Sequence, residues 1–182
     1  AEKDEKKYSG QFVSSAFSLN HNNSNAAIIG GGDGGVAREC LAKGFDLIDW
    51  YELDPEVVKA CYKHLPKICS KVKESNSIKC YWGDAFESIK SIKDSIYDKI
   101  FVDLNDDQYC IDLAAKNMNG LKRILKPGGV ITAQVGSRDK KPKQIDNWLK
   151  VLSKNFGNSK LDEVFIPSFD CRWNFASSIM NS

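Results

Sequence analysis

The sequence predicts an α/β fold with a mostly parallel, twisted sheet, helices on both of its faces and an antiparallel hairpin at the C-terminus. Short apolar runs of strand type alternate with segments of helical periodicity over most of the chain. This alternation is typical of βαβ units, whose crossover helices cover both faces of a parallel sheet. The last two apolar runs are separated only by residues 167–172, which suits a hairpin but not a crossover helix.

The pattern predicts seven strands and four helices. Residues 1–25 open with a charged, aperiodic stretch and contain a polar loop, so we expect a partly flexible N-terminal extension. Residues 26–182 are expected to form one nucleoside-binding catalytic domain, which suits the length of the chain. The expected strands are 26–29, 45–51, 78–82, 99–102, 130–135, 161–166 and 173–179, and the expected helices are 36–43, 55–65, 111–125 and 145–152.

Composition excludes several classes of protein. The net charge of +2 gives no electrostatic case for nucleic acid or an anionic membrane surface as a partner. No apolar stretch approaches the length of a membrane span and no signal peptide is recognisable, so a cytoplasmic location is expected. The six cysteines form no C-x-x-C pair and have no zinc-finger spacing to either histidine, which favours free thiols and no bound metal.

An acidic residue follows each of the first four predicted strands. Asp33 lies in the glycine-rich loop after the first strand, and Glu52, Asp84 and Asp103 follow the next three. Asp106 comes shortly after Asp103. Because ligands of open α/β sheets bind beyond the carboxyl ends of the strands, we expect these acids to converge on one site.

Each acid also has a purely structural interpretation. Asp84 could cap a helix that begins at Ala85, and Asp54 is more readily a helix cap than a ligand contact. Asp106 and Asp107 could be solvated loop residues. The functional interpretation therefore rests on the coincidence of four acids rather than on any one of them.

The glycine-rich loop also matches G-x-G-x-x-G through Gly30, Gly32 and Gly35, the fingerprint of dinucleotide sites. Asp33 argues against a dinucleotide, because a carboxylate in this loop repels the pyrophosphate that the following helix would hold. A nucleoside with a cationic arm and no phosphate would instead be attracted. We therefore expect Glu52 to bind ribose hydroxyls, Asp84 to accept from the adenine amino group and Asp33 to hold the amine of the arm.

The stretches GGGDGGVAREC, YELDPEVVKA, YWGDAF and DKIFVDLND resemble the polyamine aminopropyltransferases, the spermidine and spermine synthases, and the similarity extends from about residue 26 almost to the end. The resemblance implies a Rossmann-like, methyltransferase-type fold. It implies transfer of the aminopropyl group of decarboxylated S-adenosylmethionine to a polyamine, with release of methylthioadenosine and no metal. Asp103 takes the position of the general base. Asp33, Asp106 and Gln134 would bind the polyamine or aminopropyl group, and the nucleoside contacts would be Gly30, Gly31, Gly32, Asp33, Glu52, Leu53, Asp84, Ala85 and Asp103.

The sequence departs from the family pattern in the acidic motif, in the shortened loop that follows it and at the N-terminus. The usual D-S-S-D-P reads Asp103-Leu104-Asn105-Asp106-Asp107, without the serines and the proline. The family's N-terminal β-domain has no counterpart in this sequence, and Gln11, Phe12 and Phe17 do not reproduce the tyrosine- and glutamine-bearing segment that precedes the glycine loop. We therefore expect an intact nucleoside site and an incomplete acceptor site.

Two alternatives remain open from the sequence. One is a small-molecule methyltransferase that uses intact S-adenosylmethionine. The other is an inactive paralogue that binds the nucleoside and regulates an active synthase by pairing with it. Partners other than the nucleoside and the polyamine would then be a second copy of the chain, in a homodimer, or such a synthase.

Overall fold

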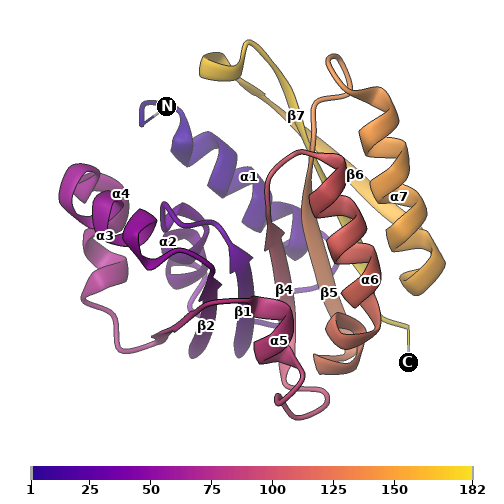
Figure 1. Ribbon diagram of the computed structural model, residues 1–182, viewed down its shortest axis with the longest axis horizontal. Helices are drawn as coiled ribbons and strands as arrows, with labels where there is room; N and C mark the ends of the chain where they lie inside the picture. The colour runs from indigo at the N-terminus through magenta and orange to yellow at the C-terminus, as the bar shows by residue number, and fades with distance from the viewer. Residues whose placement is uncertain (1, 182) are drawn as a thin grey trace.

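A single seven-stranded sheet forms the centre of the molecule (Figure 1). The computed structural model of the chain describes residues 2–181. The strand order is β3-β2-β1-β4-β5-β7-β6, in which the first five strands are parallel and β7 runs antiparallel to both β5 and β6. The strands are β1 (Asn25–Gly30), β2 (Leu47–Glu52), β3 (Ile78–Trp82), β4 (Tyr97–Asp103), β5 (Leu125–Gly136), β6 (Ser159–Ile166) and β7 (Cys171–Ile179).

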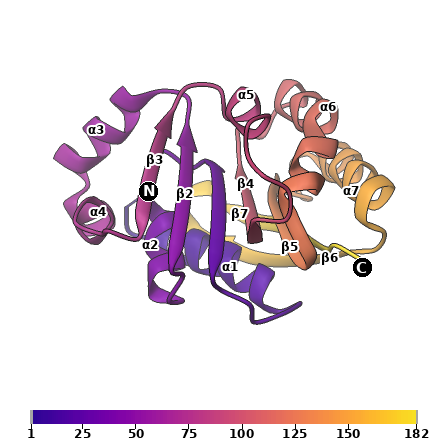
Figure 2. The same cartoon turned by 90° about the horizontal axis from the view of Figure 1, so that it is seen from below.

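Helices cover both faces of this sheet (Figure 2). Helices α1 and α2 lie on one side of the strands, α5, α6 and α7 lie on the other, and α3 and α4 lie beside the β3 end. No helix within residues 2–181 is both long and apolar enough to span a lipid bilayer. The helices are α1 (Glu5–Phe17), α2 (Gly35–Ala42), α3 (Pro55–His64), α4 (Pro66–Lys73), α5 (Ala85–Ile89), α6 (Gln108–Ile124) and α7 (Pro142–Phe156), and the 3-10 helix η1 (Pro167–Phe169) joins β6 to β7.

The strands alternate their side chains between two apolar cores. In β4, Phe101 packs on the α1 and α2 side, whereas its neighbours Ile100 and Val102 pack on the α5, α6 and α7 side. All three are buried, as expected for a central strand covered on both faces. Because β1, β2 and β4 run parallel, their carboxyl ends lie at one edge of the sheet, and the strand order reverses between β1 and β4.

The predicted fold class is confirmed, and all seven predicted strands are present. Strand β5 begins earlier than expected, at Leu125 directly after α6, and its pairing with β4 shifts between Tyr97 and Lys99. Pro127-Gly128-Gly129 thus lies within the strand, at an irregularity where Gly128 has φ of +74°. The proline and glycines end the helix as predicted, but the chain resumes pairing without a separate loop.

The N-terminus differs most from the prediction. Residues 5–17 form a helix rather than an exposed extension, and Phe12, Val13 and Ala16 are buried. Charged side chains between the apolar positions concealed this helix in the sequence. Helix α4 was also missed, because Pro66 looks like the end of a helix although it occupies the first turn of a new one.

Phe12 anchors α1 to the sheet. Its ring stacks on Phe175 of β7 with centroids 4.9 Å apart, and meets Phe101 of β4 edge to face at 5.7 Å. Before the helix, Asp4 accepts a hydrogen bond of 2.6 Å from the backbone N–H of Ser168 in η1. The N-terminal segment is therefore an integral part of one apolar core.

Truncating this anchor tests the packing of α1. We expect Phe12→Ala to lower the free energy of unfolding by about 3–5 kcal/mol, because it removes a fully buried ring and leaves a cavity. Urea denaturation followed by circular dichroism measures the change. Phe165→Ala is the matched control, because Phe165 is 52% exposed and its loss should change stability little. Equal effects of the two substitutions would contradict the packing described here.

Candidate active site

A cavity of about 770 Å³ lies at the carboxyl ends of β1, β2 and β4. The glycine-rich loop and Glu52 contribute to its lining on the sheet side, and α1 contributes Glu5 and Tyr8. The segment around η1 adds Phe169 and Trp173. The topology predicted a site at this edge of the sheet, but it did not predict a wall formed by the N-terminal helix.

The described lining of this cavity is strongly acidic. It contains seven carboxylates and no lysine, arginine or histidine, although the whole chain carries a net charge of +2. A partly desolvated cavity of this kind favours a cationic guest and disfavours phosphate. The lining acids are Glu2, Asp4, Glu5, Asp33, Glu52, Asp103 and Asp106.

Glycine is required in the loop because the backbone of β4 approaches it closely. Gly30 and Gly31 have φ of +83° and +68°, which side-chain-bearing residues rarely adopt. A Cβ on Gly30 would lie 2.4 Å from the carbonyl oxygen of Asp103, and a Cβ on Gly31 would lie 2.9 Å from Asp103 Oδ2. The loop therefore lies directly against Asp103 and closes one side of the cavity.

Asp103 is held by a tyrosine from α1. The Tyr8 hydroxyl donates a hydrogen bond of 2.6 Å to Asp103 Oδ1. The Tyr8 ring is enclosed by aromatic side chains, with Phe175 5.2 Å away and Trp173 6.4 Å away between ring centroids. The hydroxyl thus fixes one carboxylate oxygen, and Oδ2 lies on the side of the glycine loop.

Burial raises the pKa of Asp103 from its ordinary value of 3.8 to about 7. The negative charges of Asp33, Glu52 and Glu5 add to this rise, whereas the hydrogen bond from Tyr8 opposes it. Burial also raises the pKa of Tyr8, as does its neighbour Asp103, so the tyrosine stays protonated and remains a donor. A carboxyl group with a pKa near neutrality is suited to accepting a proton from a substrate.

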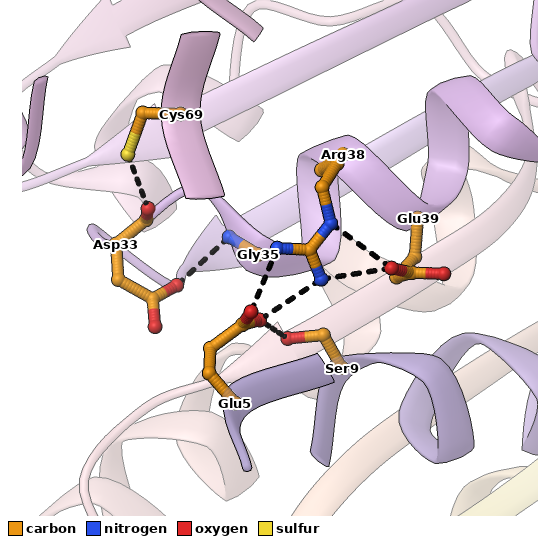
Figure 3. A network of polar contacts seen from close by, with 7 residues as sticks. All are labelled: Glu5, Ser9, Asp33, Gly35, Arg38, Glu39 and Cys69. Carbon is orange, nitrogen blue, oxygen red and sulfur yellow. Dashed lines mark hydrogen bonds and ion pairs between the residues drawn. The ribbon is translucent and has the colours of Figure 1, made fainter. Parts of the chain in front are cut away.

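Asp33 lies in the glycine loop beside the start of α2. Its Oδ1 accepts a hydrogen bond of 2.8 Å from the backbone N–H of Gly35 (Figure 3). Burial raises the pKa of Asp33, and the charge of Glu5 adds to the rise, whereas the bond from Gly35 and the charge of Arg38 lower it. The structure places Asp33 in the cavity together with Glu52 and Asp103, as predicted.

The predicted adenine contacts lie at the edge of this site rather than in the cavity. Leu53, Asp84 and Ala85 are not among its lining residues, and the Leu53 side chain is 72% exposed. Asp84 caps α5 by accepting a hydrogen bond of 2.8 Å from the N–H of Phe86, which confirms the structural interpretation of this acid. The backbone N–H of the preceding Gly83 donates a hydrogen bond of 2.9 Å to the carbonyl of Glu52, so the end of β3 stays beside the end of β2.

Asp106 and Gln134 lie on the other side of Asp103. Asp106 Oδ2 is paired with Lys141 Nζ at 3.0 Å near the cavity mouth. Gln134 on β5 donates through its amide to the carbonyl of Leu104 and accepts a hydrogen bond of 3.1 Å from the Trp173 indole N–H. Both residues line the cavity, and their role as contacts to the acceptor stays a prediction.

Tyr8 is the residue that sequence reasoning missed. The signal was available in the spacing of Tyr8, Phe12 and Ala16, which places three side chains on one face of a helix. Because Lys6 and Lys7 directly precede Tyr8, the segment was interpreted as part of a charged terminus rather than as an amphipathic helix. A short segment before the glycine loop therefore does complete one wall of the cavity.

Asp54 and Asp107 have structural roles instead. The side chain of Asp54 caps α3 through a bond of 2.9 Å from the N–H of Glu56, as expected. Asp107 caps α6 through a bond of 2.8 Å from the N–H of Cys110. Among residues 2–181, no group of three or more His, Cys, Asp or Glu side chains is arranged to hold a metal ion.

Comparison with known proteins establishes the family of this chain. The family model described as the spermine/spermidine synthase domain matches residues 5–181. The chain belongs to this family. The match begins at the residue where α1 begins, so the N-terminal helix is part of the spermine/spermidine synthase domain.

Curated relatives and solved structures agree with this assignment. Polyamine aminopropyltransferases from Prochlorococcus marinus strains MIT 9215 and MIT 9301 are each 34% identical over 182 residues, which cover 97% of this chain and 64% of theirs. The crystal structure of spermidine synthase from Thermotoga maritima has the same fold, with a TM-score of 0.86 and 22% identity over 97% of this chain and 60% of that one. A spermidine synthase in complex with the transition state analogue AdoDATO has a TM-score of 0.88, also at 22% identity, over 97% of this chain and 61% of that one. The chain thus spans about 64% of the length of the curated relatives.

The raised pKa of Asp103 makes stability depend on pH. The folded-state pKa of about 7 lies above the ordinary value of 3.8, so the contribution of Asp103 to stability is greatest below pH 3.8 and is lost as the pH rises to about 7. The substitution Asp103→Asn removes this decrease in stability, because an amide does not ionise. We expect it to increase the free energy of unfolding by about 2 kcal/mol more at pH 8 than at pH 5.

Urea unfolding of both proteins at the two pH values provides the measurement. The control is Asp107→Asn, because asparagine caps a helix about as well as aspartate and the residue is outside the cavity. If the stabilisation by Asp103→Asn were the same at pH 5 and pH 8, the pKa of Asp103 would not be raised.

Proposed function

We propose that the chain transfers the aminopropyl group of decarboxylated S-adenosylmethionine to an amine of a polyamine, with Asp103 as general base. The observation that carries this proposal is the Tyr8–Asp103 pair in a cavity lined only by carboxylates and neutral groups. The names of the curated relatives, polyamine aminopropyltransferases, support the same reaction.

The nucleoside donor fits the side of the cavity formed by the ends of β1 and β2. The glycine loop admits close approach of the donor, and Glu52 at the end of β2 can accept hydrogen bonds from ribose hydroxyls. Asp33 can pair with the ammonium of the aminopropyl arm. The adenine would lie towards Leu53, Asp84 and Ala85 at the ends of β2 and β3, where Leu53 offers an exposed apolar side chain.

Asp84 can accept a hydrogen bond from adenine through its second carboxylate oxygen while its first oxygen caps α5. Its Oδ1 accepts from the N–H of Phe86, and a carboxylate has further acceptor sites for an exocyclic amino group. Ala85, the first residue of α5, would present its backbone next to the base. The capping hydrogen bond thus orients the Asp84 carboxylate that would bind the adenine amino group.

The chemical step requires a deprotonated amine and a good leaving group. The nitrogen lone pair of the acceptor attacks the carbon beside the sulfonium, a C–N bond forms, and the C–S bond breaks with its electrons moving to sulfur. Methylthioadenosine leaves as a neutral thioether. Asp103 takes the proton of the attacking nitrogen, which a carboxyl group with a pKa of about 7 can do near neutral pH.

The acceptor polyamine fits the opposite side of the cavity. Asp106 can pair with its distal ammonium, and the ring of Trp173 offers an aromatic face to a cation. Gln134, held by Trp173 and Leu104, presents its amide beside Asp103. Tyr8 keeps the Asp103 carboxylate turned so that Oδ2 remains available to the amine.

The acidic lining also argues against intact S-adenosylmethionine as the substrate. That nucleoside carries a carboxylate on the same arm as its amine, and the carboxylate would enter a site that already holds Asp33, Glu5 and Asp103. The decarboxylated form brings only positive charge. The hydrogen-bonded Tyr8–Asp103 pair likewise argues against an inactive paralogue.

Asp103→Asn tests the role of the base. We expect kcat to fall by about 10²–10⁴-fold, because an amide cannot accept the proton. For the wild-type chain, kcat/KM should rise tenfold per pH unit below about 7 and then level off, since only ionised Asp103 is active. Chromatographic measurement of methylthioadenosine released from decarboxylated S-adenosylmethionine and spermidine or putrescine gives both quantities.

Asp107→Asn is the matched control and should keep wild-type activity. Methylthioadenosine binding by Asp103→Asn shows that the variant retains its nucleoside site. Wild-type turnover with no dependence on Asp103 would overturn the assignment of the base, and a folded wild-type chain that releases no methylthioadenosine would overturn the proposed reaction.

Asp33→Asn tests the recognition of the aminopropyl amine. We expect the Kd for decarboxylated S-adenosylmethionine to rise by about 10–100-fold, because a charge-assisted hydrogen bond to the ammonium is lost. The Kd for methylthioadenosine should change much less, since this nucleoside has no amine. Calorimetric titration of both ligands measures the difference.

Asp54→Asn makes the same chemical change at a helix cap and should alter neither Kd. Equal weakening of the two ligands by Asp33→Asn would show that Asp33 supports the nucleoside rather than the amine. Tighter binding of intact than of decarboxylated S-adenosylmethionine by the wild-type chain would favour a methyltransferase.

A further inference from the structure

A buried ion pair joins α1 to α2 next to the cavity. Arg38 on α2 donates to both oxygens of Glu5 on α1, from Nη1 to Oε2 at 2.7 Å and from Nη2 to Oε1 at 3.2 Å (Figure 3). The side chains of Glu5 and Arg38 are only 8% and 15% exposed. Because the pair is bidentate and largely removed from water, it fixes distance and orientation better than a surface pair does.

Two further side chains complete this contact. The hydroxyl of Ser9, one turn after Glu5, donates a hydrogen bond of 2.5 Å to Glu5 Oε1. Glu39, next to Arg38, accepts from Arg38 Nε at 3.0 Å and from Nη2 at 2.8 Å. The guanidinium is therefore held from two sides, and the Glu5 carboxylate has three hydrogen bonds from side chains.

The same contact explains the last glycine of the loop. Gly35 begins α2, and a Cβ placed on it would lie 1.9 Å from Glu5 Oε1 and 2.4 Å from Ser9 Oγ. The backbone N–H of Gly35 meanwhile donates to Asp33. Glycine at this position lets α1 approach α2 closely enough for Glu5 to reach Arg38.

Glu5 and Tyr8 are three residues apart, so they lie on neighbouring positions of one helix face. Glu5 is anchored to α2 by Arg38, and Tyr8 donates to Asp103 at the end of β4. Any shift of the first turns of α1 would move the Tyr8 hydroxyl with it. A displacement near 1 Å is enough to break a hydrogen bond of 2.6 Å.

We infer that Arg38 is a positioning residue: through Glu5 it sets the place of α1, and thereby holds the Tyr8 hydroxyl on Asp103. Its effect on transfer of the aminopropyl group rests on the proposed function. Its effect on the Tyr8–Asp103 hydrogen bond does not. The two consequences call for separate measurements.

The kinetic test is a double-mutant cycle between Arg38 and Tyr8. Arg38→Gln should lower kcat by about 10–100-fold, the scale of a 1 Å misplacement, and Tyr8→Phe should lower it similarly. Because both substitutions remove the same contact, the double variant should be no slower than Tyr8→Phe. Multiplicative losses in the double variant would overturn the inference, since Arg38 would then act independently of Tyr8.

The second measurement does not depend on catalysis. The charged and titratable groups that face Asp103 are Tyr8 and Glu5 from α1, Asp33 from the glycine loop and Glu52 from β2. In the pair variant Glu5→Gln/Arg38→Gln, loss of the Glu5 charge by itself lowers the pKa of Asp103, so the substitution does not produce a rise electrostatically. A rise in the pKa of the Asp103 carboxyl, followed by carbon-13 NMR, then reports loss of the Tyr8 hydrogen bond.

Gly35→Ala gives an independent route to the same displacement. It keeps both charges but fills the space that Glu5 occupies, so it should also lower kcat and raise the pKa of Asp103. Circular dichroism of each variant shows that the fold is retained. An unchanged Asp103 titration in folded Gly35→Ala, which keeps every charge near Asp103, would overturn the inference even if the wild-type chain had no activity.

Arg172→Gln is the matched control. Arg172 pairs with Glu163 at 2.9 Å on the hairpin, and the two side chains are 63% and 52% exposed. The same chemical change at this exposed pair should leave kcat and the pKa of Asp103 as in the wild-type chain. If Arg172→Gln reproduced the effects of Arg38→Gln, loss of a positive charge anywhere would account for them and the positioning role would be wrong.

Discussion

Carboxylates that repel one another are held in one cavity by the ends of β1, β2 and β4 and by the first turns of α1. The repulsion is visible in the chemistry of Asp103, whose pKa is raised to about 7 by burial together with Asp33, Glu52 and Glu5. Among the neighbouring residues that shift the pKa of Asp103, only Tyr8 lowers it, through its hydrogen bond. A folded protein tolerates such a cluster because the surrounding apolar cores supply the stability that the cluster lacks.

In the proposed function, the same repulsion selects the bound molecule. A cationic nucleoside relieves the unfavourable interactions among the acids, whereas a phosphate would add to them. The position of the cavity follows from topology, because parallel strands deliver their carboxyl ends to one edge and the strand order reverses between β1 and β4. The loop at that edge can pass against Asp103 because Gly30 and Gly31 adopt positive φ, which glycine does without a steric penalty.

The sequence predicted the sheet and its acidic rim because both depend on local patterns. Periodicity revealed the strands, and the acids follow them directly, so Asp33, Glu52 and Asp103 could be placed without knowing any long-range contact. The wall of the cavity was not predictable in this way. The hydrogen bond from Tyr8 to Asp103 joins residues 95 positions apart in the sequence, and the helix that carries Tyr8 has few apolar residues by which it could be predicted. The capping role of Asp84 was foreseen as one of two alternatives, and the structure shows the cap, whereas the contact to adenine stays a prediction.

The central claim is that Asp103 is partly protonated in the resting protein and becomes ionised when a cation enters the cavity. Calorimetric titration at pH 7 with decarboxylated S-adenosylmethionine, repeated in buffers of different ionisation enthalpy, counts the protons exchanged on binding. A nearby positive charge lowers the pKa of a carboxyl group, so the account predicts net release of a substantial fraction of a proton. Binding with no proton exchange, or with net proton uptake, would contradict it.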